Sequence, residues 1–323
     1  MRIAVDTLGG DNGSPIVVKA ILEFLSKHPE ISITAVGNKD ELKELEGKCE
    51  IIHAPDIVPM EAGPLEAMRM KNSSLYVMAQ LAKENKVDAL VSAGSTGGFL
   101  SLTTLILKTI PGVHRAALVA PFPTRIKGKK VVILDIGASN ENSPEELEQF
   151  SVMGSLYSKY ILGVENPSVC LLSNGTEAGK GSPVSKEAYK LLKDKPEFKG
   201  NIEARNALSG ECDVIVTDGF TGNIFLKSSE GMAKMMSGMI KDAFKRNLWS
   251  KLGYLHVKKG IKEMSETMDY KSTGGAMLLG INGVVVKAHG NSDVYSFGCA
   301  LEVALKLVEN DLINKIKEGI QDA

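Results

Sequence analysis

The chain alternates short apolar runs with longer segments in which apolar residues recur at helical spacing. Each apolar run stops at a small polar loop, and a helical pattern starts directly after that loop. Strands that are apolar on both faces and are followed by helices are typical of a parallel sheet covered on both sides. We therefore expect an α/β protein with three layers, α/β/α, around a mainly parallel sheet. The six runs are Ile3–Val5, Ala89–Val91, Val131–Leu134, Val169–Leu172, Val214–Val216 and Val284–Lys287.

The loops that follow these runs are rich in Gly, Ser, Thr, Asn and Asp. In a parallel sheet such loops meet outside the carboxyl edge, where ligands bind. Free N–H groups and the dipole at a helix start favour an anion there. We therefore predict an anion site built from several loops on one edge of the sheet. The loops are 6–11, 92–98, 135–140, 173–182, 217–223 and 288–293.

Helical periodicity and cap residues divide the rest of the chain. Prolines in three expected first turns make the serines before them, Ser14, Ser143 and Ser182, predicted N-caps. No repeat or low-complexity linker is present, so we expect a single domain over 1–323. Predicted helices are 15–27, 66–84, 96–107, 144–162, 183–192, 222–246 and 294–317. Further strands are predicted at 32–36, 50–54, 116–120 and 201–204.

Segment 241–268 interrupts the alternation, because it has no strand pattern and its apolar stripe changes face. The predicted break is Gly253 or Gly260, giving a protruding kinked helix or helical pair. One interpretation is a helix pair in a dimer interface, and the other is a peripheral membrane tip whose lysines meet anionic lipid. Both can hold, since the stems can pair while the tip touches lipid. The predicted membrane contacts are Leu248, Trp249, Leu252 and Leu255.

The composition narrows the class of protein. A formal net charge of −1 gives no electrostatic reason to expect nucleic-acid binding. The 4 cysteines lack C-x-x-C spacing, which favours buried thiols in a reducing compartment over disulfides or zinc. The first residues show no secretory pattern, and no apolar run approaches the roughly 20 residues of a membrane-spanning helix. We therefore expect a soluble cytoplasmic protein.

Familiar catalytic motifs do not account for the loops. The run Gly175–Ser182 resembles a nucleotide P-loop, but its glycines are one residue too close and Gly181 replaces the Mg²⁺-binding hydroxyl. No G-x-G-x-x-G follows a strand and no G-x-S-x-G is present, which argues against a usual nicotinamide site and against a serine hydrolase. Aspartates at the strand ends can ligate a metal or brace the glycine turns, and we favour bracing. We expect no metal and no cofactor.

Taken together, these loops resemble those of the bacterial phosphate acyltransferase family, which makes acyl phosphate from fatty acyl-acyl carrier protein. The resemblance follows the chain in order, from Asp6–Asp11 through Asn174–Gly181 to Lys287–Asp293. It implies a fold related to phosphate acetyltransferases and to the isocitrate and isopropylmalate dehydrogenases. It also implies a homodimer associated peripherally with the inner face of the cell membrane. The implied partners are acyl carrier protein, inorganic phosphate and a downstream glycerol-3-phosphate acyltransferase.

The resemblance and the loop chemistry together assign roles. Lys180 would neutralise phosphate or the oxyanion, Asn223 would donate to the thioester carbonyl, and His289 would protonate the leaving thiolate or orient its loop. The helix start after the second run would hold phosphate, while the aspartates would fix the loops. The predicted substrate-binding residues are Asp6, Gly9, Gly10, Asp11, Ser95, Thr96, Gly97, Asp135, Gly137, Thr176, Glu177, Thr221 and Gly222.

Three other functions remain open from the sequence. The first is a phosphate acyltransferase that uses a small acyl-CoA, which activity on acetyl-CoA alone would reveal. The second is a metal-dependent dehydrogenase of similar fold, which metal-stimulated NAD reduction would reveal. The third is a non-catalytic membrane-recruitment protein, which would leave six donor-rich loops unexplained.

Overall fold

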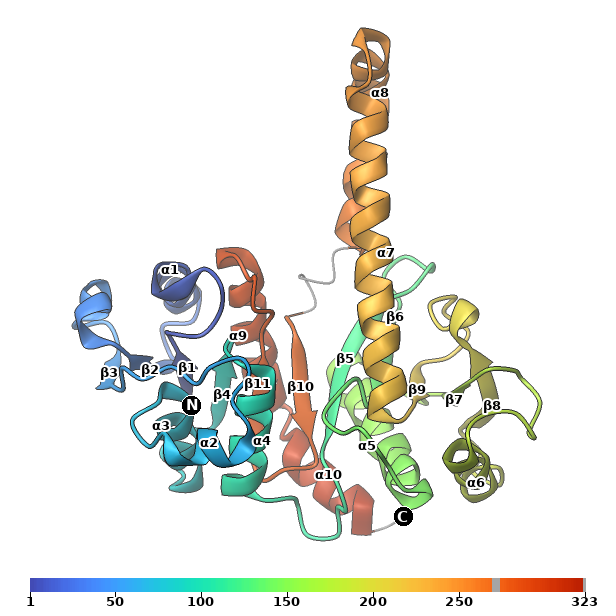
Figure 1. The fold of residues 1–323 in the computed structure, drawn as a ribbon, viewed down its shortest axis with the longest axis horizontal. Helices are drawn as coiled ribbons and strands as arrows, with labels where there is room; N and C mark the ends of the chain where they lie inside the picture. The colour runs from blue at the N-terminus through green and yellow to red at the C-terminus, as the bar shows by residue number, and fades with distance from the viewer. Residues whose placement is uncertain (269–273, 322–323) are drawn as a thin grey trace.

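A single 11-stranded sheet forms the body of the protein, in the computed structural model that describes residues 1–268 and 274–321 (Figure 1). The strand order is β3-β2-β1-β4-β11-β10-β5-β6-β9-β7-β8. The strands are β1 (Arg2–Asp6), β2 (Ser32–Gly37), β3 (Glu50–His53), β4 (Ala89–Ser92), β5 (Ala117–Pro123), β6 (Lys130–Leu134), β7 (Val169–Ser173), β8 (Phe198–Glu203), β9 (Val214–Val216), β10 (Ala276–Leu279) and β11 (Val284–Lys287).

Helices cover both faces of the sheet. The helices are α1 (Gly13–Lys27), α2 (Pro64–Arg69), α3 (Ser74–Lys83), α4 (Thr96–Leu107), α5 (Pro144–Leu162), α6 (Pro183–Leu192), α7 (Gly219–Lys245), α8 (Leu248–Met268), α9 (Val294–Glu309) and α10 (Leu312–Gln321). Ile3 and Val5 belong to one apolar core with α1, α5 and α9, whereas Ala4 belongs to a second core with α3 and α4. Successive residues of a strand point to opposite faces, so this division confirms the predicted three layers.

The direction of the strands reverses in the middle of the sheet. β10 is antiparallel to β11, β5 is antiparallel to β10, and β6 is antiparallel to β5. The half with β1, β4 and β11 is parallel, and so is the half with β6, β9 and β7, but the two halves run in opposite directions. The prediction that all six loops lie on one edge is therefore wrong. Three loops lie at one edge and three at the opposite edge.

Two predicted helices are divided and one predicted cap is wrong. The expected helix 66–84 is split into α2 and α3, and 294–317 is split into α9 and α10, where Asp311 has a φ of 51°. Ser143 and Ser182 cap α5 and α6 as predicted. Ser14 instead lies inside α1, where its hydroxyl donates to Glu41, because α1 begins at Gly13.

The helices α7 and α8 form a hairpin that projects away from the sheet (Figure 1). With 27 residues, α7 is about 40 Å long. The turn lies at Arg246–Asn247, so the prediction of a break at Gly253 or Gly260 is wrong. Asn247 accepts a hydrogen bond from Ser250 N at 2.8 Å, as an N-cap does. A glycine inside a helix is tolerated at a cost of about 1 kcal/mol, so neither glycine had to end the helix.

Candidate functional site

The loop after β1 is held in place by a buried carboxylate. Asp6 is 1% exposed, and its Oδ1 accepts hydrogen bonds from Leu8 N at 3.1 Å and Gly9 N at 3.2 Å. Its Oδ2 accepts from Ser92 Oγ at 2.6 Å, and that hydroxyl accepts from Gly94 N at 2.9 Å. Asp6 therefore braces two loops, after β1 and after β4, at once.

The loop after β11 lies at the same edge of the sheet. We call the loops after β1, β4 and β11 the rim. Asp11 N donates to the carbonyl of Gly290 at 2.7 Å, and Asn12 Nδ2 donates to the carbonyl of Ser292 at 2.8 Å. Gly10 has a φ of 95°, and a Cβ there would lie 2.9 Å from the carbonyl oxygen of Gly290. The three loops of this edge thus meet through close backbone contacts, which requires small residues. His289 lies in this rim and is half-buried.

The N-terminus of α4 lies at this rim. Ser95 is 2% exposed, and its hydroxyl accepts a hydrogen bond from Gly98 N at 3.2 Å. That hydroxyl is therefore the N-cap of α4, and it also donates to the carbonyl of Met60 at 3.4 Å. Thr96 and Gly97 are exposed in the first turn, where N–H groups have no partner within the helix. This geometry suits an anion.

A second carboxylate braces the opposite edge. Asp135 is fully buried and accepts hydrogen bonds from Gly137 N, Ala138 N, Ser139 N and the Ser139 hydroxyl at 2.7 to 3.0 Å. Burial raises the pKa of Asp135, and these hydrogen bonds oppose that rise. A Cβ at Gly222 would lie 1.9 Å from the Asp135 carbonyl oxygen, so the first turn of α7 is pressed against this loop.

The helix α7 connects the two edges. Asn223 is exposed near the start of α7, and a Cβ added to Gly137 would lie 3.4 Å from the Asn223 side chain. Lys227 follows one turn later on the same helical face. Its charge is near enough to lower the pKa of Lys287, which lies at the end of β11 on the first edge. The exposed face of α7 that carries Asn223 therefore turns toward the rim that Asp6 braces.

The remaining predicted site residues are Thr221 and those in the loop after β7. Thr221 donates from its N–H and hydroxyl to Asp218, at 2.8 Å each, so Asp218 caps α7. In the loop after β7, Lys180 is exposed, and Lys180 N donates to the carbonyl of Glu177 at 3.0 Å. Asn201 Nδ2 donates to the same carbonyl at 2.8 Å. The contact with Asn201 ties Glu177 to β8, at the opposite edge of the sheet from the rim at β1.

One residue of the rim was missed from the sequence. Lys287 is the last residue of β11 and is 8% exposed. The three residues before it in the strand are all valines. Burial lowers the pKa of Lys287 to about 8, with the charge of Lys227 acting the same way and Asp6 and Asp11 opposing it. A lysine at the inner end of an all-valine strand was the signal available in the sequence.

Comparison with known proteins identifies the family. The family model described as "Fatty acid synthesis protein" matches residues 1–315. A "Phosphate acyltransferase" of Exiguobacterium sp. strain AT1b is 43% identical over 326 residues, with 99% of each chain covered. One of Thermosipho africanus is 40% identical over 323 residues, covering 99% of this chain and 98% of the relative.

Solved structures bear on the fold alone. A phosphotransacetylase of Streptococcus pyogenes is 18% identical with a TM-score of 0.61, covering 96% of this chain and 94% of that one. A protein described as a 4-hydroxythreonine-4-phosphate dehydrogenase of Salmonella typhimurium is 14% identical with a TM-score of 0.52, covering 95% and 99%. The expected relation to phosphate acetyltransferases is thereby confirmed for the fold. On the full-length sequence matches, the chain belongs to the phosphate acyltransferase family.

Proposed function

We propose that the protein transfers a long-chain fatty acyl group from acyl-acyl carrier protein to inorganic phosphate. The product is an acyl phosphate for phospholipid synthesis. The observation that carries this proposal is the match of nearly the whole chain to proteins named phosphate acyltransferase. The rim of backbone donors at the start of α4 supports it, because such a rim suits a small anion.

The reaction places few demands on the protein. A phosphate oxygen attacks the thioester carbonyl carbon, the new C–O bond forms, the C–S bond breaks, and the released thiolate takes a proton. Phosphate is largely dianionic near pH 7 by analogy with phosphomonoesters, whose second pKa is about 6. The leaving thiol has an ordinary pKa of about 8.5. The protein therefore has to position the reactants and stabilise negative charge.

The roles follow from this demand. The backbone N–H groups of Thr96 and Gly97 bind phosphate, and the amide of Asn223 donates to the thioester carbonyl. His289 orients its loop or protonates the thiolate. Lys180 remains a predicted cation on the β7 loop.

A cavity beside α7 offers space for the acyl chain. It has a volume of about 810 Å³ and is lined largely by apolar side chains, including Phe122, Phe225, Met232 and Met236. Phe225 lies on α7, the helix that also carries Asn223, so the cavity is next to the helix of the proposed carbonyl site. A two-carbon acyl group would not need such a volume, which favours a long chain over the small acyl-CoA alternative.

One assay tests the proposed reaction. Purified protein is incubated with palmitoyl-acyl carrier protein and inorganic phosphate, and acyl phosphate is measured as its hydroxamate. Parallel reactions contain acetyl-CoA and phosphate. Acyl phosphate from the carrier substrate alone is the expected result. Turnover of acetyl-CoA alone would replace the proposal by the small acyl-CoA reaction.

We propose that the hairpin tip touches the membrane surface. Leu248 is 71% exposed, Trp249 81%, Leu252 45% and Leu255 66%, beside several lysines. None of the helices within 1–268 and 274–321 is long and apolar enough to cross a bilayer. Apolar contact with the interface and attraction of the lysines to anionic lipid would hold the protein on one leaflet.

The Leu248→Ala/Trp249→Ala double variant is expected to bind anionic vesicles at least about tenfold more weakly in sedimentation. Burying one large apolar side chain contributes about 1.5–3 kcal/mol, and 1.4 kcal/mol corresponds to tenfold. Leu65→Ala is the matched control, since Leu65 is 75% exposed on α2, away from the hairpin. Equal binding of the double variant and the wild type would show that the tip does not contact lipid.

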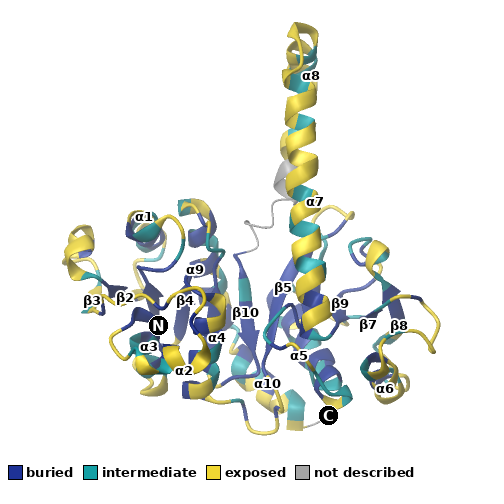
Figure 2. Ribbon diagram, viewed as in Figure 1, coloured by how far each residue is buried: buried dark blue, intermediate teal, exposed yellow. Residues whose placement is uncertain are grey.

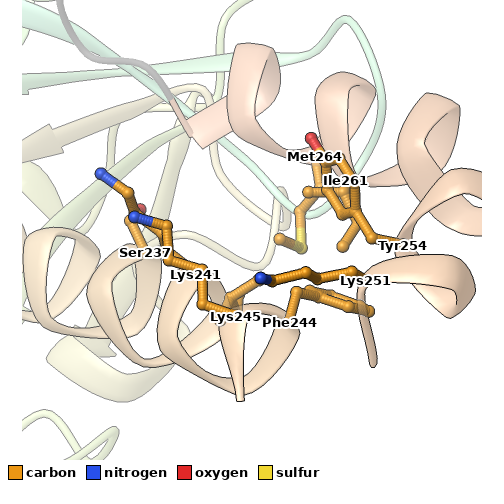
Figure 3. Close-up of a pocket in the computed structure, with 9 residues that line it drawn as sticks. Ser237, Lys241, Phe244, Lys245, Lys251, Tyr254, Ile261 and Met264 are labelled. Carbon is orange, nitrogen blue, oxygen red and sulfur yellow. The ribbon is translucent and has the colours of Figure 1, made fainter. Parts of the chain in front are cut away.

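We propose a homodimer through the hairpin stems. Met235 and Met239 lie one turn apart and form an exposed apolar stripe on α7, and Figure 2 shows the projecting helices exposed along most of their length. Between the helices, Phe244, Tyr254, Ile261 and Met264 line a further pocket of about 530 Å³ (Figure 3). Two such hairpins would bury these faces as a four-helix bundle.

Sedimentation velocity is expected to give twice the chain mass of 34.6 kDa for the wild type. Met239→Glu would place a charge in the buried stripe and shift the protein toward monomer. Lys234→Glu, an exposed change on the same helix, should leave the mass unchanged. A wild-type monomer would refute the interface.

A further inference from the structure

We infer that Lys287 supplies the cation that binds the phosphate substrate, from beneath the rim formed by the loops after β1, β4 and β11. This inference rests on the proposed function, because it assigns a residue to the phosphate of that reaction. The position was not among the residues predicted from the sequence.

The first argument is the position of Lys287. It is the last residue of β11 and pairs in register with Ser92, the last residue of β4. Ser92 in turn donates to Asp6, which braces the loop after β1. The side chain therefore starts beside the end of β4, at the edge from which all three loops depart. A ligand held by the start of α4 would lie at the same edge.

The second argument is the surroundings of the ammonium group. Lys287 Nζ donates a hydrogen bond to the carbonyl of Ala288, which leaves two of its N–H donors for another acceptor. Within the described residues it forms no ion pair with a carboxylate, although Asp6 and Asp11 lie near enough to act on its charge. A buried charge without a close partner is costly, so an anionic partner is expected from outside the chain.

The third argument is access. Asp11 and Lys227, which both act on the charge of Lys287, are themselves exposed, and they lie on different elements. The ammonium therefore lies near both the β1 loop and α7, beside residues that solvent reaches. Its pKa of about 8 leaves the group largely protonated at neutral pH, as binding of a dianion requires.

The test compares Lys287→Met with the wild type and measures phosphate binding by calorimetry, without the acyl substrate. The dissociation constant for phosphate is expected to rise about tenfold to a hundredfold, the range for loss of one charge-assisted hydrogen bond. The KM for phosphate should rise in the same proportion, while the KM for acyl-acyl carrier protein stays unchanged. Lys130→Met is the matched control, because burial also lowers the pKa of Lys130, at the start of β6.

A structural role would give a different result. If Lys287 only balanced the charge of Asp6, Lys287→Met would change the melting temperature and leave phosphate affinity as in the wild type, and the inference would be overturned. If wild-type protein bound phosphate through Lys287 but made no acyl phosphate, the inference would stand and the proposed reaction would fail.

A second measurement uses wild-type protein in case the variant does not fold. Reductive methylation with and without phosphate is followed by peptide mass spectrometry. Lys287 should be labelled without phosphate and protected with it, and Lys130 should be labelled equally in both. An unlabelled Lys287, or one labelled equally in both conditions, would contradict the inference.

Discussion

Gly9→Ala is expected to lower kcat/KM by more than about 100-fold, because a displacement of about 1 Å in a site can have this effect. The added Cβ would lie 2.4 Å from Gly94 N and 2.3 Å from Asp6 Oδ2, so the loops after β1 and β4 would have to separate. That movement would break the hydrogen bonds through which Asp6 aligns both loops. Overpacking of this kind also costs about 1–3 kcal/mol of unfolding free energy.

The measurement is the rate of acyl phosphate formation, together with chemical denaturation to follow stability. Gly231→Ala is the matched control, since a Cβ there meets no atom within 4 Å. Alanine also has the higher helix propensity, so this control should be at least as stable as the wild type. Normal turnover by a folded Gly9→Ala protein would show that the approach of the two loops is not needed for the reaction.

Asn223→Ala is expected to lower kcat by about 100- to 1000-fold, the range for removal of one oxyanion donor. The asparagine is exposed near the start of α7, beside Gly137, so its truncation removes no buried contact of the core. The loss should therefore appear in kcat, with little change in the free energy of unfolding. A loss confined to the transition state would lower kcat and kcat/KM in equal proportion.

Ser228→Ala provides the comparison for this prediction, because Ser228 is exposed on the same helix beyond the proposed carbonyl site. Single-turnover kinetics with palmitoyl-acyl carrier protein would separate the chemical step from product release. If kcat stayed normal and only the KM for the acyl substrate rose, Asn223 would serve in binding and another donor would face the oxyanion.

These two predictions probe opposite edges of one sheet. Gly9 belongs to the rim at the ends of β1, β4 and β11, whereas Asn223 follows β9 in the half that runs the other way. A substantial loss in both variants would show that the reaction uses both halves. The helix α7 makes this possible, because it starts at the second edge and carries Asn223 and Lys227 toward the first.

Local chemistry at the two edges was predictable from the sequence. Asp6 and Asp135 each follow a strand of aliphatic residues and precede glycines, a pattern that indicates a carboxylate bracing a turn. The structure gives both carboxylates that bracing position. Ser143 and Ser182 as helix caps and the burial of both strand faces followed from the same local rules.

Which loops lie at the same edge depends on whether neighbouring strands run parallel or antiparallel. The connection from β5 to β6 is short and carries no helix, which is the signal of an antiparallel pair. The strand β10 has only four residues, and its reversal next to β11 cannot be read from its own composition. With β5 paired antiparallel to β10 as well, three reversals separate the two halves, and missing them placed all six loops on one edge.

The sequence by itself determined the elements, the bracing residues and the family, because these depend on residues near one another along the chain and on the order of motifs. Only the tertiary structure decided which loops share an edge, where the hairpin turns, and that Lys287 is buried where the charges of Asp6 and Lys227 act on it. Strand pairing and the desolvation of a charge arise mainly from contacts between segments far apart in sequence, which a local pattern indicates only in part.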